Sequence, residues 1–310
     1  MKKSENLYLQ TKDFSITGEP FAVCFNKEFD MLVTTPQPKA EHLSNYYNSE
    51  LYISHLTKKR SPLDWVYFLV RNYTLRSKIK LISKFSVHKK TLLDFGAGSG
   101  FFVRATTKAG WKSIGIETSK DAREAANIVS PNSIFSNSHI DKLELNTVSV
   151  ITLWHVLEHL LHPDLHIEKF KQLLTKDGRL VVAVPNYKSY DAAYFKEFWA
   201  AYDVPRHLWH FSQQSISRLF SQHDFEIETI HPMRFDAYYV SLLSTKSTYG
   251  KMNIFKALWL GFVSNVRAQR TGAYSSLLSV LKHNANYYTL FYSFFRSLFK
   301  AILSFPTKVL

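Results

Sequence analysis

The stretch TLLDFGAGSGFF (residues 91–102) carries the residues with the clearest chemical meaning. An apolar run ends in the acid Asp94, and Gly96, Gly98 and Gly100 follow at alternate positions. Glycines that directly follow a strand leave backbone N–H groups open and let a ligand approach more closely than any Cβ would allow. The pattern therefore predicts a loop for a nucleotide-like ligand. The plainer alternative is a tight turn that only packs a helix against a strand.

The spacing of these glycines distinguishes between nucleotide-binding loops. The dinucleotide fingerprint Gly-x-Gly-x-x-Gly needs its third glycine where this chain has Phe101, and the Walker loop needs a Gly-Lys-Ser/Thr that does not follow. Glu117 ends the next predicted strand, and an acid at that place can accept hydrogen bonds from both hydroxyls of a ribose. A nucleoside with a short charged tail is therefore the ligand that fits best.

A second stretch of interest is HVLEH, in which His155, Glu158 and His159 match the inverted zinc-protease motif His-x-x-Glu-His. On a helix the two histidines would lie one turn apart, and His162 would extend the same face. However, the segment follows a buried strand as the turn into a crossover helix, and no partnering acidic ligand stands out downstream. We therefore expect no metal here, and we interpret these residues as packing residues and as the floor of the ligand site.

A regular framework must position these residues, and the pattern from residue 90 onward provides one. Short apolar runs alternate with helical patterns, which is typical of βαβ units and a mostly parallel sheet. The predicted strands are 90–95, 112–117, 133–135, 148–154, 178–185, 225–232 and 274–283. The predicted helices are 100–110, 119–130, 163–178 and 212–224, and Gly178 is expected to end the third. The predicted fold class is α/β, a doubly wound, Rossmann-like, mostly parallel seven-stranded sheet with helices on both faces.

Composition limits the classes of protein to which the chain can belong. The 310 residues are 45% hydrophobic, which is enough for a sizeable core and argues against disorder. The formal charge of +14 suits nucleic acid, an anionic membrane surface or an acidic substrate as partner. The single cysteine, Cys24, cannot form an internal disulfide and no signal peptide is recognised, so we expect a cytoplasmic protein. Charges interrupt every long apolar window, which argues against a membrane span.

Several stretches together resemble one enzyme family. LLDFGAGSGFF and GIE are similar to the first two motifs of class I S-adenosylmethionine-dependent methyltransferases. VITLWHVLEHLLHP, DGRLVVAVPN and FWAAYDVPRHLWHFS resemble later signatures of a bacterial ubiquinone-biosynthesis-like subfamily, type 23-like, so that the resemblance covers about residues 13–283. It implies S-adenosylmethionine as cofactor. The cofactor-binding residues it implies are Asp94, Phe95, Gly96, Ala97, Gly98, Gly100 and Phe101 at the methionine end, Glu117 and Thr118 at the ribose, Asn137 or Ser138 near the adenine, and Trp154 and His155 at the floor.

Residues 186–211 are predicted to form an ordered lid over the cofactor, since a long aromatic segment without periodicity is usually functional. Methyl transfer needs the nucleophile, the methyl group and the sulfur in line, and histidine is the usual base for a hydroxyl nucleophile. We predict that His207 or His210 is the base and that Arg206 binds an anionic group of the substrate. An equally open alternative is that these histidines tie the loop to the core. The aromatic residues of the lid either line a site for a flat or apolar acceptor or form a second core.

Both ends of the chain carry additions to the domain at 90–283. Residues 1–38 resemble a small zinc ribbon, but Asn26 and Phe29 replace its Cys-x-x-Cys pair and Cys24 is out of register. A lone thiol cannot build a tetrahedral site, so we expect a metal-free remnant in which Cys24 is buried. Residues 39–89 are predicted to be helical, as is an insertion at 235–271. The tail at 284–310 is apolar and basic, and its residues 285–310 either lie in a membrane interface or pack on the protein or in a dimer.

These observations predict an S-adenosylmethionine-dependent methyltransferase that O-methylates a small or lipid-like acceptor in the cytoplasm, with the tail as a peripheral contact to the inner membrane face. Two alternatives stay open. The basic charge suggests an RNA methyltransferase, although no RNA-binding module is recognisable and nucleic acid is not the expected partner. The lost ribbon cysteines suggest a non-catalytic cofactor-binding protein.

Overall fold

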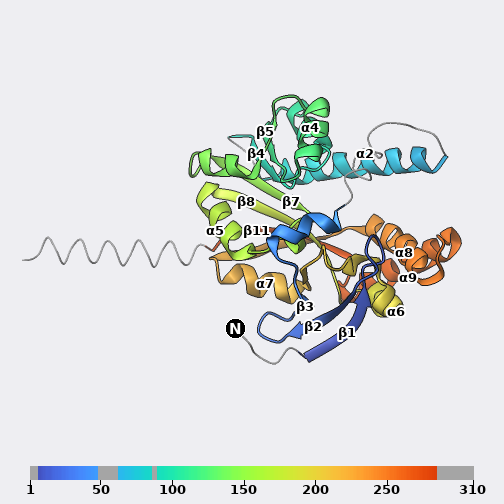
Figure 1. The fold of residues 1–310 in the computed structure, drawn as a ribbon. Helices are drawn as coiled ribbons and strands as arrows, with labels where there is room; N and C mark the ends of the chain where they lie inside the picture. The colour runs from blue at the N-terminus through green and yellow to red at the C-terminus, as the bar shows by residue number, and fades with distance from the viewer. Residues whose placement is uncertain (1–5, 48–61, 86–88, 285–310) are drawn as a thin grey trace, which may run out of the picture.

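The computed structural model describes residues 6–47, 62–85 and 89–284. Its centre is a seven-stranded sheet in the order β10-β11-β8-β7-β4-β5-β6 (Figure 1). The strands are β4 (Thr91–Phe95), β5 (Lys112–Ile116), β6 (Ile134–Phe135), β7 (Val148–Trp154), β8 (Leu174–Pro185), β10 (Phe225–Pro232) and β11 (Ser276–His283). β4 to β8 pair in parallel, and β11 runs antiparallel to β8 and β10. The predicted mostly parallel seven-stranded sheet is confirmed.

Helices cover both faces of this sheet. The helices are α2 (Pro62–Ile82), α3 (Phe101–Lys108), α4 (Lys120–Val129), α5 (Pro163–Leu173), α6 (Tyr190–Phe195), α7 (Gln213–Ser221), α8 (Arg234–Tyr249) and α9 (Ile254–Thr271). Leu93 belongs to the core that holds buried side chains of α5 and α7, whereas its neighbour Leu92 belongs to the core with α2 and α3. Successive side chains of a strand point to opposite faces, so a strand covered on both faces must be apolar throughout.

The boundary between α5 and β8 differs from the prediction. We expected the helix to continue to Gly178, but α5 ends at Leu173 and β8 begins at Leu174. Both leucines are fully buried in the same core, and Leu174 pairs with Val148 at the start of β7. The apolar pair satisfies a helical and an extended pattern equally well, so the periodicity alone could not locate the boundary.

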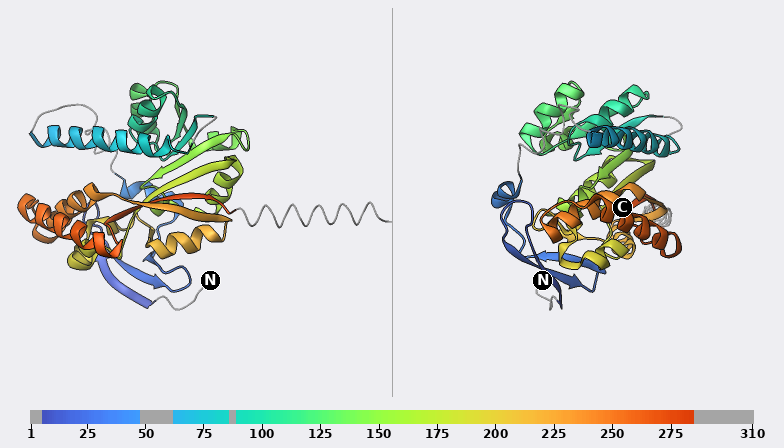
Figure 2. Two further views of the ribbon diagram at one scale, coloured as in Figure 1. Left: turned by 180° about the vertical axis from the view of Figure 1, so that it is seen from behind. Right: turned by 90° about the vertical axis from the view of Figure 1, so that its right-hand side faces the viewer.

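A second, four-stranded antiparallel sheet lies at the end of the molecule opposite α4 (Figure 2). It has the order β1-β2-β3-β9, with β1 (Asn6–Lys12), β2 (Pro20–Asn26), β3 (Met31–Thr35) and β9 (Trp209–His210). Cys24 is buried on β2, as predicted. At the place of the first missing ribbon cysteine, the Asn26 side-chain oxygen accepts a hydrogen bond of 3.2 Å from the Phe29 amide.

The segment predicted as a lid packs against this N-terminal sheet. Besides α6 and β9 it contains the 3-10 turns η4 (Lys196–Phe198) and η5 (Ala200–Tyr202). Phe195, Trp199 and Tyr202 are buried in one cluster with Phe21 and Leu32 of the sheet. These aromatic residues therefore form a second core, which was one of the two interpretations drawn from the sequence, whereas Tyr194 is exposed and Phe211 belongs to the main core.

The remaining additions are helical. The 3-10 helix η1 (Ala40–Tyr46) precedes α2, and α8 and α9 form the insertion between β10 and β11 that was predicted at 235–271. Two further 3-10 turns, η2 (Asn137–Lys142) and η3 (Leu157–His159), follow β6 and β7. In the described part of the chain, no helix has the length and apolar character that a membrane crossing needs. The tail at 285–310 lies outside the described residues.

Candidate functional site

The glycine loop lies at the carboxyl end of β4, where it turns into α3. Gly96, Gly98 and Gly100 all have positive φ, at 76°, 50° and 71°, a region that other residues rarely adopt. A Cβ on Gly96 would lie 2.3 Å from a methyl carbon of Val156, so the loop is backed by the turn that follows β7. A Cβ on Gly98 would meet nothing within 4 Å. Gly98 therefore faces open space, where a ligand can approach the backbone.

Two acids frame this loop. The Glu117 carboxylate accepts hydrogen bonds from the amides of Gly98 at 2.9 Å and Ser119 at 3.0 Å, which ties the end of β5 to the glycine turn. Asp94 is buried at the next-to-last position of β4, where it accepts a hydrogen bond of 2.6 Å from the Thr152 hydroxyl on β7. Both acids therefore lie at the carboxyl edge of the sheet, where α/β folds bind ligands.

Two cations from α2, which were not predicted from the sequence, also reach this region. The Lys78 ammonium lies 3.8 Å from the centre of the Trp154 ring, and the Arg71 guanidinium lies 4.0 Å from the centre of the Phe101 ring. Spacing by seven places Arg71 and Lys78 on one face of a helix. The spacing could have placed Arg71 and Lys78 on the same face of the helix, but it could not show that this face lies towards the glycine loop.

Burial shifts the pKa values of Asp94 and Lys78. It raises the pKa of Asp94 to about 7, and Glu117 adds to this, while the hydrogen bond from Thr152 and the charge of Lys78 oppose it. Burial also lowers the pKa of Lys78 to about 8, against the attraction of Asp94 and Asp236. Both groups therefore change protonation near neutral pH.

We expect Asp94→Asn to gain stability over the wild-type protein as pH rises from about 4 to about 8 without ligand. The raised pKa means that the folded carboxyl holds its proton more tightly than the unfolded chain, whose value is about 3.9. Its favourable contribution is complete below the unfolded pKa and is lost as pH rises to about 7. Asparagine still accepts the hydrogen bond from Thr152 and carries no charge. Urea unfolding at several pH values measures the difference, which should be absent for Asp121→Asn at an exposed position of α4.

The residues that follow β7 form a polar cluster around the buried Glu158. His155 has a positive φ of 56°, and its two ring nitrogens face Glu158 at 3.5 Å and Asp236 of α8 at 3.1 Å. Although burial opposes it, these two acids raise the pKa of His155 to about 10. His155 is therefore a cation held between two carboxylates beside Trp154, the position at which the sequence predicted the floor of the site.

The same turn brings together residues that are distant in sequence. Glu158, His159 and His207 each place one potential ligand atom within 4.8 Å of the others. The backbone supports this arrangement, because the Leu208 amide donates a hydrogen bond of 2.8 Å to the Glu158 carbonyl. Burial, with a contribution from the neighbouring His207, lowers the pKa of His159 to about 4, so the imidazole of His159 is neutral at neutral pH.

The three predicted catalytic residues, Arg206, His207 and His210, do not face the same site. The Arg206 guanidinium binds Asp13 at 3.0 Å and Asp203 at 2.7 Å, and the His210 Nε2 lies 2.9 Å from the Thr34 hydroxyl. Burial, with His207 adding to it, lowers the pKa of His210 to about 3. Arg206 and His210 thus bind the N-terminal segment, and His207 is the predicted residue that joins Glu158 and His159.

The predicted adenine and ribose residues lie further along the same sheet edge. Asn137 and Ser138 are exposed in η2, directly after β6, and Thr118 is exposed after β5. The Phe135 and His139 rings stack beside them with centroids 4.0 Å apart. Because β5 and β6 are parallel neighbours, these side chains continue the edge that begins at the glycine loop.

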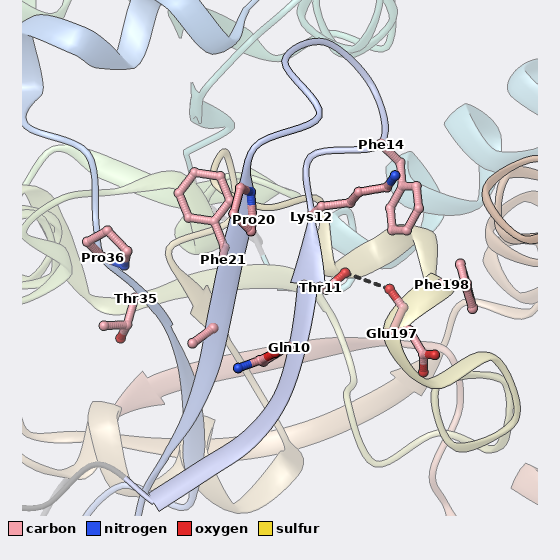
Figure 3. A pocket seen from close by; sticks show the side chains of 11 residues that line it. Gln10, Thr11, Lys12, Phe14, Pro20, Phe21, Thr35, Pro36, Glu197 and Phe198 are labelled. Atoms are coloured by element: carbon pink, nitrogen blue, oxygen red, sulfur yellow. Dashed lines mark hydrogen bonds between the residues drawn. The ribbon is translucent and has the colours of Figure 1, made fainter.

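A cavity of about 600 Å³ lies elsewhere, on the N-terminal sheet (Figure 3). Its lining residues come from β1, β2, β3 and η4 and their flanks: Gln10, Thr11, Lys12, Phe14, Pro20, Phe21, Ala22, Thr35, Pro36, Glu197 and Phe198. The Thr11 hydroxyl donates a hydrogen bond of 2.6 Å to the Glu197 carbonyl at its wall. Neither the glycine loop nor the histidine cluster lines this cavity, so we do not assign the chemistry to it.

Comparison with known proteins agrees with the geometry of the sheet edge. The family model described as a methyltransferase domain matches residues 67–230, which include the glycine loop, Glu117 and the turn after β7. No curated protein matches the chain.

Solved structures show the same fold at low sequence identity. Geranyl diphosphate C-methyltransferase from Streptomyces coelicolor A3(2) is 14% identical with a TM-score of 0.51, over 79% of this chain and 100% of that one. A putative sarcosine dimethylglycine methyltransferase from Galdieria sulphuraria is 13% identical with a TM-score of 0.50, over 76% and 98%. The cyclopropane synthase MmaA2 from Mycobacterium tuberculosis is 14% identical with a TM-score of 0.50, over 80% and 99%.

Proposed function

Because the chain belongs to the methyltransferase domain family and is an S-adenosylmethionine-dependent methyltransferase, we propose that it transfers the methyl group to a hydroxyl oxygen of a small or lipid-like acceptor. The proposal concerns the acceptor and the residues that face it. The observation that carries it is the buried Glu158 carboxylate, whose two oxygens have no hydrogen-bond partner among the described residues.

The residues at the sheet edge fit the cofactor. Gly98 leaves space in front of the backbone, Glu117 has two carboxylate oxygens at the end of β5, and the buried Trp154 Nε1 has no hydrogen-bond partner among the described residues. When bound, S-adenosylmethionine supplies a methyl group on a sulfonium, a leaving group already activated by its charge. The protein's own task is to hold the acceptor in line and to keep water out.

Glu158 and the histidines beside it suit an acceptor that carries a hydroxyl group. An ionised carboxylate only accepts hydrogen bonds, so an O–H donor is its natural partner. The turn that carries Glu158 lies against the glycine loop through Val156, which puts an acceptor bound at Glu158 next to the cofactor site. Activation of the hydroxyl then falls to the cluster of Glu158, His159 and His207, directly or through an ion that the cluster holds.

A pair of variants tests whether Glu117 binds the cofactor and Glu158 acts on the acceptor. Glu117→Gln should lower affinity for S-adenosylmethionine by roughly tenfold to 100-fold, because it removes the charged acceptor for the ribose hydroxyls. Glu158→Gln should keep that affinity and lower kcat by a similar factor, since hydrogen bonds to a charged group contribute about 1.5–3 kcal/mol. Calorimetry measures the first effect, and transfer of labelled methyl to simple and prenylated phenols measures the second.

The same experiment decides between acceptors. Methyl transfer to RNA that falls steeply with salt, with none to any hydroxyl compound, would replace the proposal with the RNA alternative. Binding of the cofactor without transfer to any acceptor in an extract of the source cell would favour the non-catalytic alternative.

A further inference from the structure

We propose that Glu158, His159 and His207 hold a divalent transition-metal ion, and that zinc suits them best. One atom from each side chain lies within 4.8 Å of the others. The three residues come from η3 and from the segment before β9, two elements joined by the hydrogen bond between the Leu208 amide and the Glu158 carbonyl. The backbone therefore holds the three side chains together without relying on contacts between them.

The hydrogen bonds of the two histidines leave the nitrogens that a metal needs. The His159 Nδ1 lies 3.0 Å from the Arg206 carbonyl and 3.1 Å from the Tyr47 hydroxyl, and the His207 Nδ1 lies 2.8 Å from the Ala201 carbonyl. A carbonyl only accepts, so a proton on each Nδ1 satisfies these contacts, and each Nε2 then keeps its lone pair. An imidazole that donates Nδ1–H to a carbonyl and presents Nε2 is the usual arrangement around a bound metal.

Glu158 is a second and independent observation. Its side chain is fully buried, and neither carboxylate oxygen has a hydrogen-bond partner among the described residues. The nearest cation is His155, whose Nδ1 lies 3.5 Å from Oε1, an ion-pair contact without a well-formed hydrogen bond. A carboxylate buried in this way is costly unless a cation or several donors stabilise it. A bound metal ion would supply that stabilisation.

The donor set identifies the class of ion. Two imidazole nitrogens and one carboxylate form the ligand set of open zinc sites, whereas Mg²⁺ and Ca²⁺ prefer oxygen ligands throughout. Asp203 lies close by, with its Oδ2 3.9 Å from the His207 Nε2, but its two oxygens accept hydrogen bonds from Arg206. Three protein ligands leave at least one position for a water molecule or a substrate oxygen.

This site differs from the one that the HVLEH motif suggests. A helical reading would pair His155 with His159, but His155 has a positive φ and turns towards Asp236. His207 takes its place from a distant part of the chain. The expectation that the motif holds no metal rested on its place after a buried strand and on the absence of an acidic partner downstream, whereas the partner proposed here is a histidine.

The role of the ion rests on the proposed function, although its binding does not. The open position would take the hydroxyl oxygen of the acceptor and lower its pKa, so that its proton leaves to solvent. The O–C bond then forms as the S–C bond breaks, and the sulfonium becomes a neutral thioether. Glu158, His159 and His207 would hold the ion in place, and through it the acceptor oxygen.

Metal titration of the full chain tests the site directly. After dialysis against a chelator, we expect calorimetry with Zn²⁺ to show one ion per chain, and Co²⁺ to give the visible absorption of a low-coordinate site. Glu158→Gln and His207→Ala should each weaken binding by at least about 100-fold, since even residues behind the ligands contribute tenfold to 100-fold. His231→Ala, a partly exposed histidine at the end of β10, should bind as the wild-type protein does.

The outcomes separate this proposal from the proposed function. Wild-type protein that binds no stoichiometric Zn²⁺ or Co²⁺, or one-to-one binding that survives Glu158→Gln, would overturn the metal site even if O-methylation is observed. Stoichiometric metal binding without methyl transfer to any hydroxyl compound would support the metal site and contradict the proposed hydroxyl acceptor. If His207→Ala does not fold, Glu158→Gln, which keeps the shape of the side chain, still tests whether these residues bind the metal.

Discussion

Replacing Arg206 with methionine is expected to lower the free energy of unfolding by about 3–5 kcal/mol, because it breaks a buried ion-pair network and leaves its acids unpaired. Arg206 is 7% exposed, and its guanidinium binds Asp13 at 3.0 Å and Asp203 at 2.7 Å. It also donates a hydrogen bond of 3.0 Å to the Tyr46 carbonyl. One side chain thus joins the N-terminal segment, the end of η1 and the turn before β9. Urea unfolding at neutral pH measures the loss.

The pH dependence of this loss follows from Asp13. Burial works to raise the pKa of Asp13, but hydrogen bonds from Arg206, Thr17 and Ser15 hold it below its usual value. A lowered pKa contributes stability that is present above the unfolded value of about 3.9 and is lost as pH falls through the folded value. The difference between the wild-type protein and Arg206→Met should therefore shrink as the solution is acidified below about pH 4.

The control is Arg218→Met on α7. This guanidinium is exposed and donates to the carbonyls of Lys27 and Glu28, so it too contacts the N-terminal segment, but without burial. Its loss should change stability by less than about 1 kcal/mol. Should Arg206→Met unfold like the wild-type protein while KM for the acceptor rises, the substrate-binding role predicted from the sequence would hold instead.

The central sheet could be predicted because its physics is local. Strands buried on both faces must be apolar throughout, and the glycine loop after β4 needs residues that tolerate positive φ, as Gly96 and Gly98 do. Both requirements leave a mark within a few residues of the chain. The acid at Glu117 is part of the same local pattern, since β5 is the next strand along the chain and pairs with β4 in parallel.

The histidine cluster could not be predicted, because it depends on contacts between distant segments. Nothing near His207 indicates that its ring meets His159, with centroids 4.6 Å apart, or that Arg206 faces Asp13. In the same way, the sequence of α2 does not indicate that Lys78 contacts Trp154. Residue types therefore identified which side chains could do chemistry in this region, and only the fold determined which of them meet.

A large effect on cofactor binding is expected from Gly98→Ala, which should weaken the affinity for S-adenosylmethionine by roughly tenfold to 100-fold. The added methyl group would project into the open space in front of the loop, and filling space that a ligand must occupy costs about 1–3 kcal/mol by analogy with overpacked cores. Gly98 also has a φ of 50°, where an alanine is strained by roughly 1–2 kcal/mol, but this strain is the same with and without the cofactor and lowers only the stability of the fold.

Gly110 and Gly96 provide matched comparisons for this substitution. Gly110 has a φ of 83° and equally open surroundings at the end of α3, so Gly110→Ala carries the backbone strain and should leave cofactor affinity unchanged. Gly96→Ala adds a contact of 2.3 Å with Val156 and should lose stability as well as affinity. Calorimetry and thermal unfolding on the three variants separate these effects. Equal affinity in Gly98→Ala and Gly110→Ala would mean that the cofactor does not lie against Gly98, and that the loop serves only to pack α3 against β4.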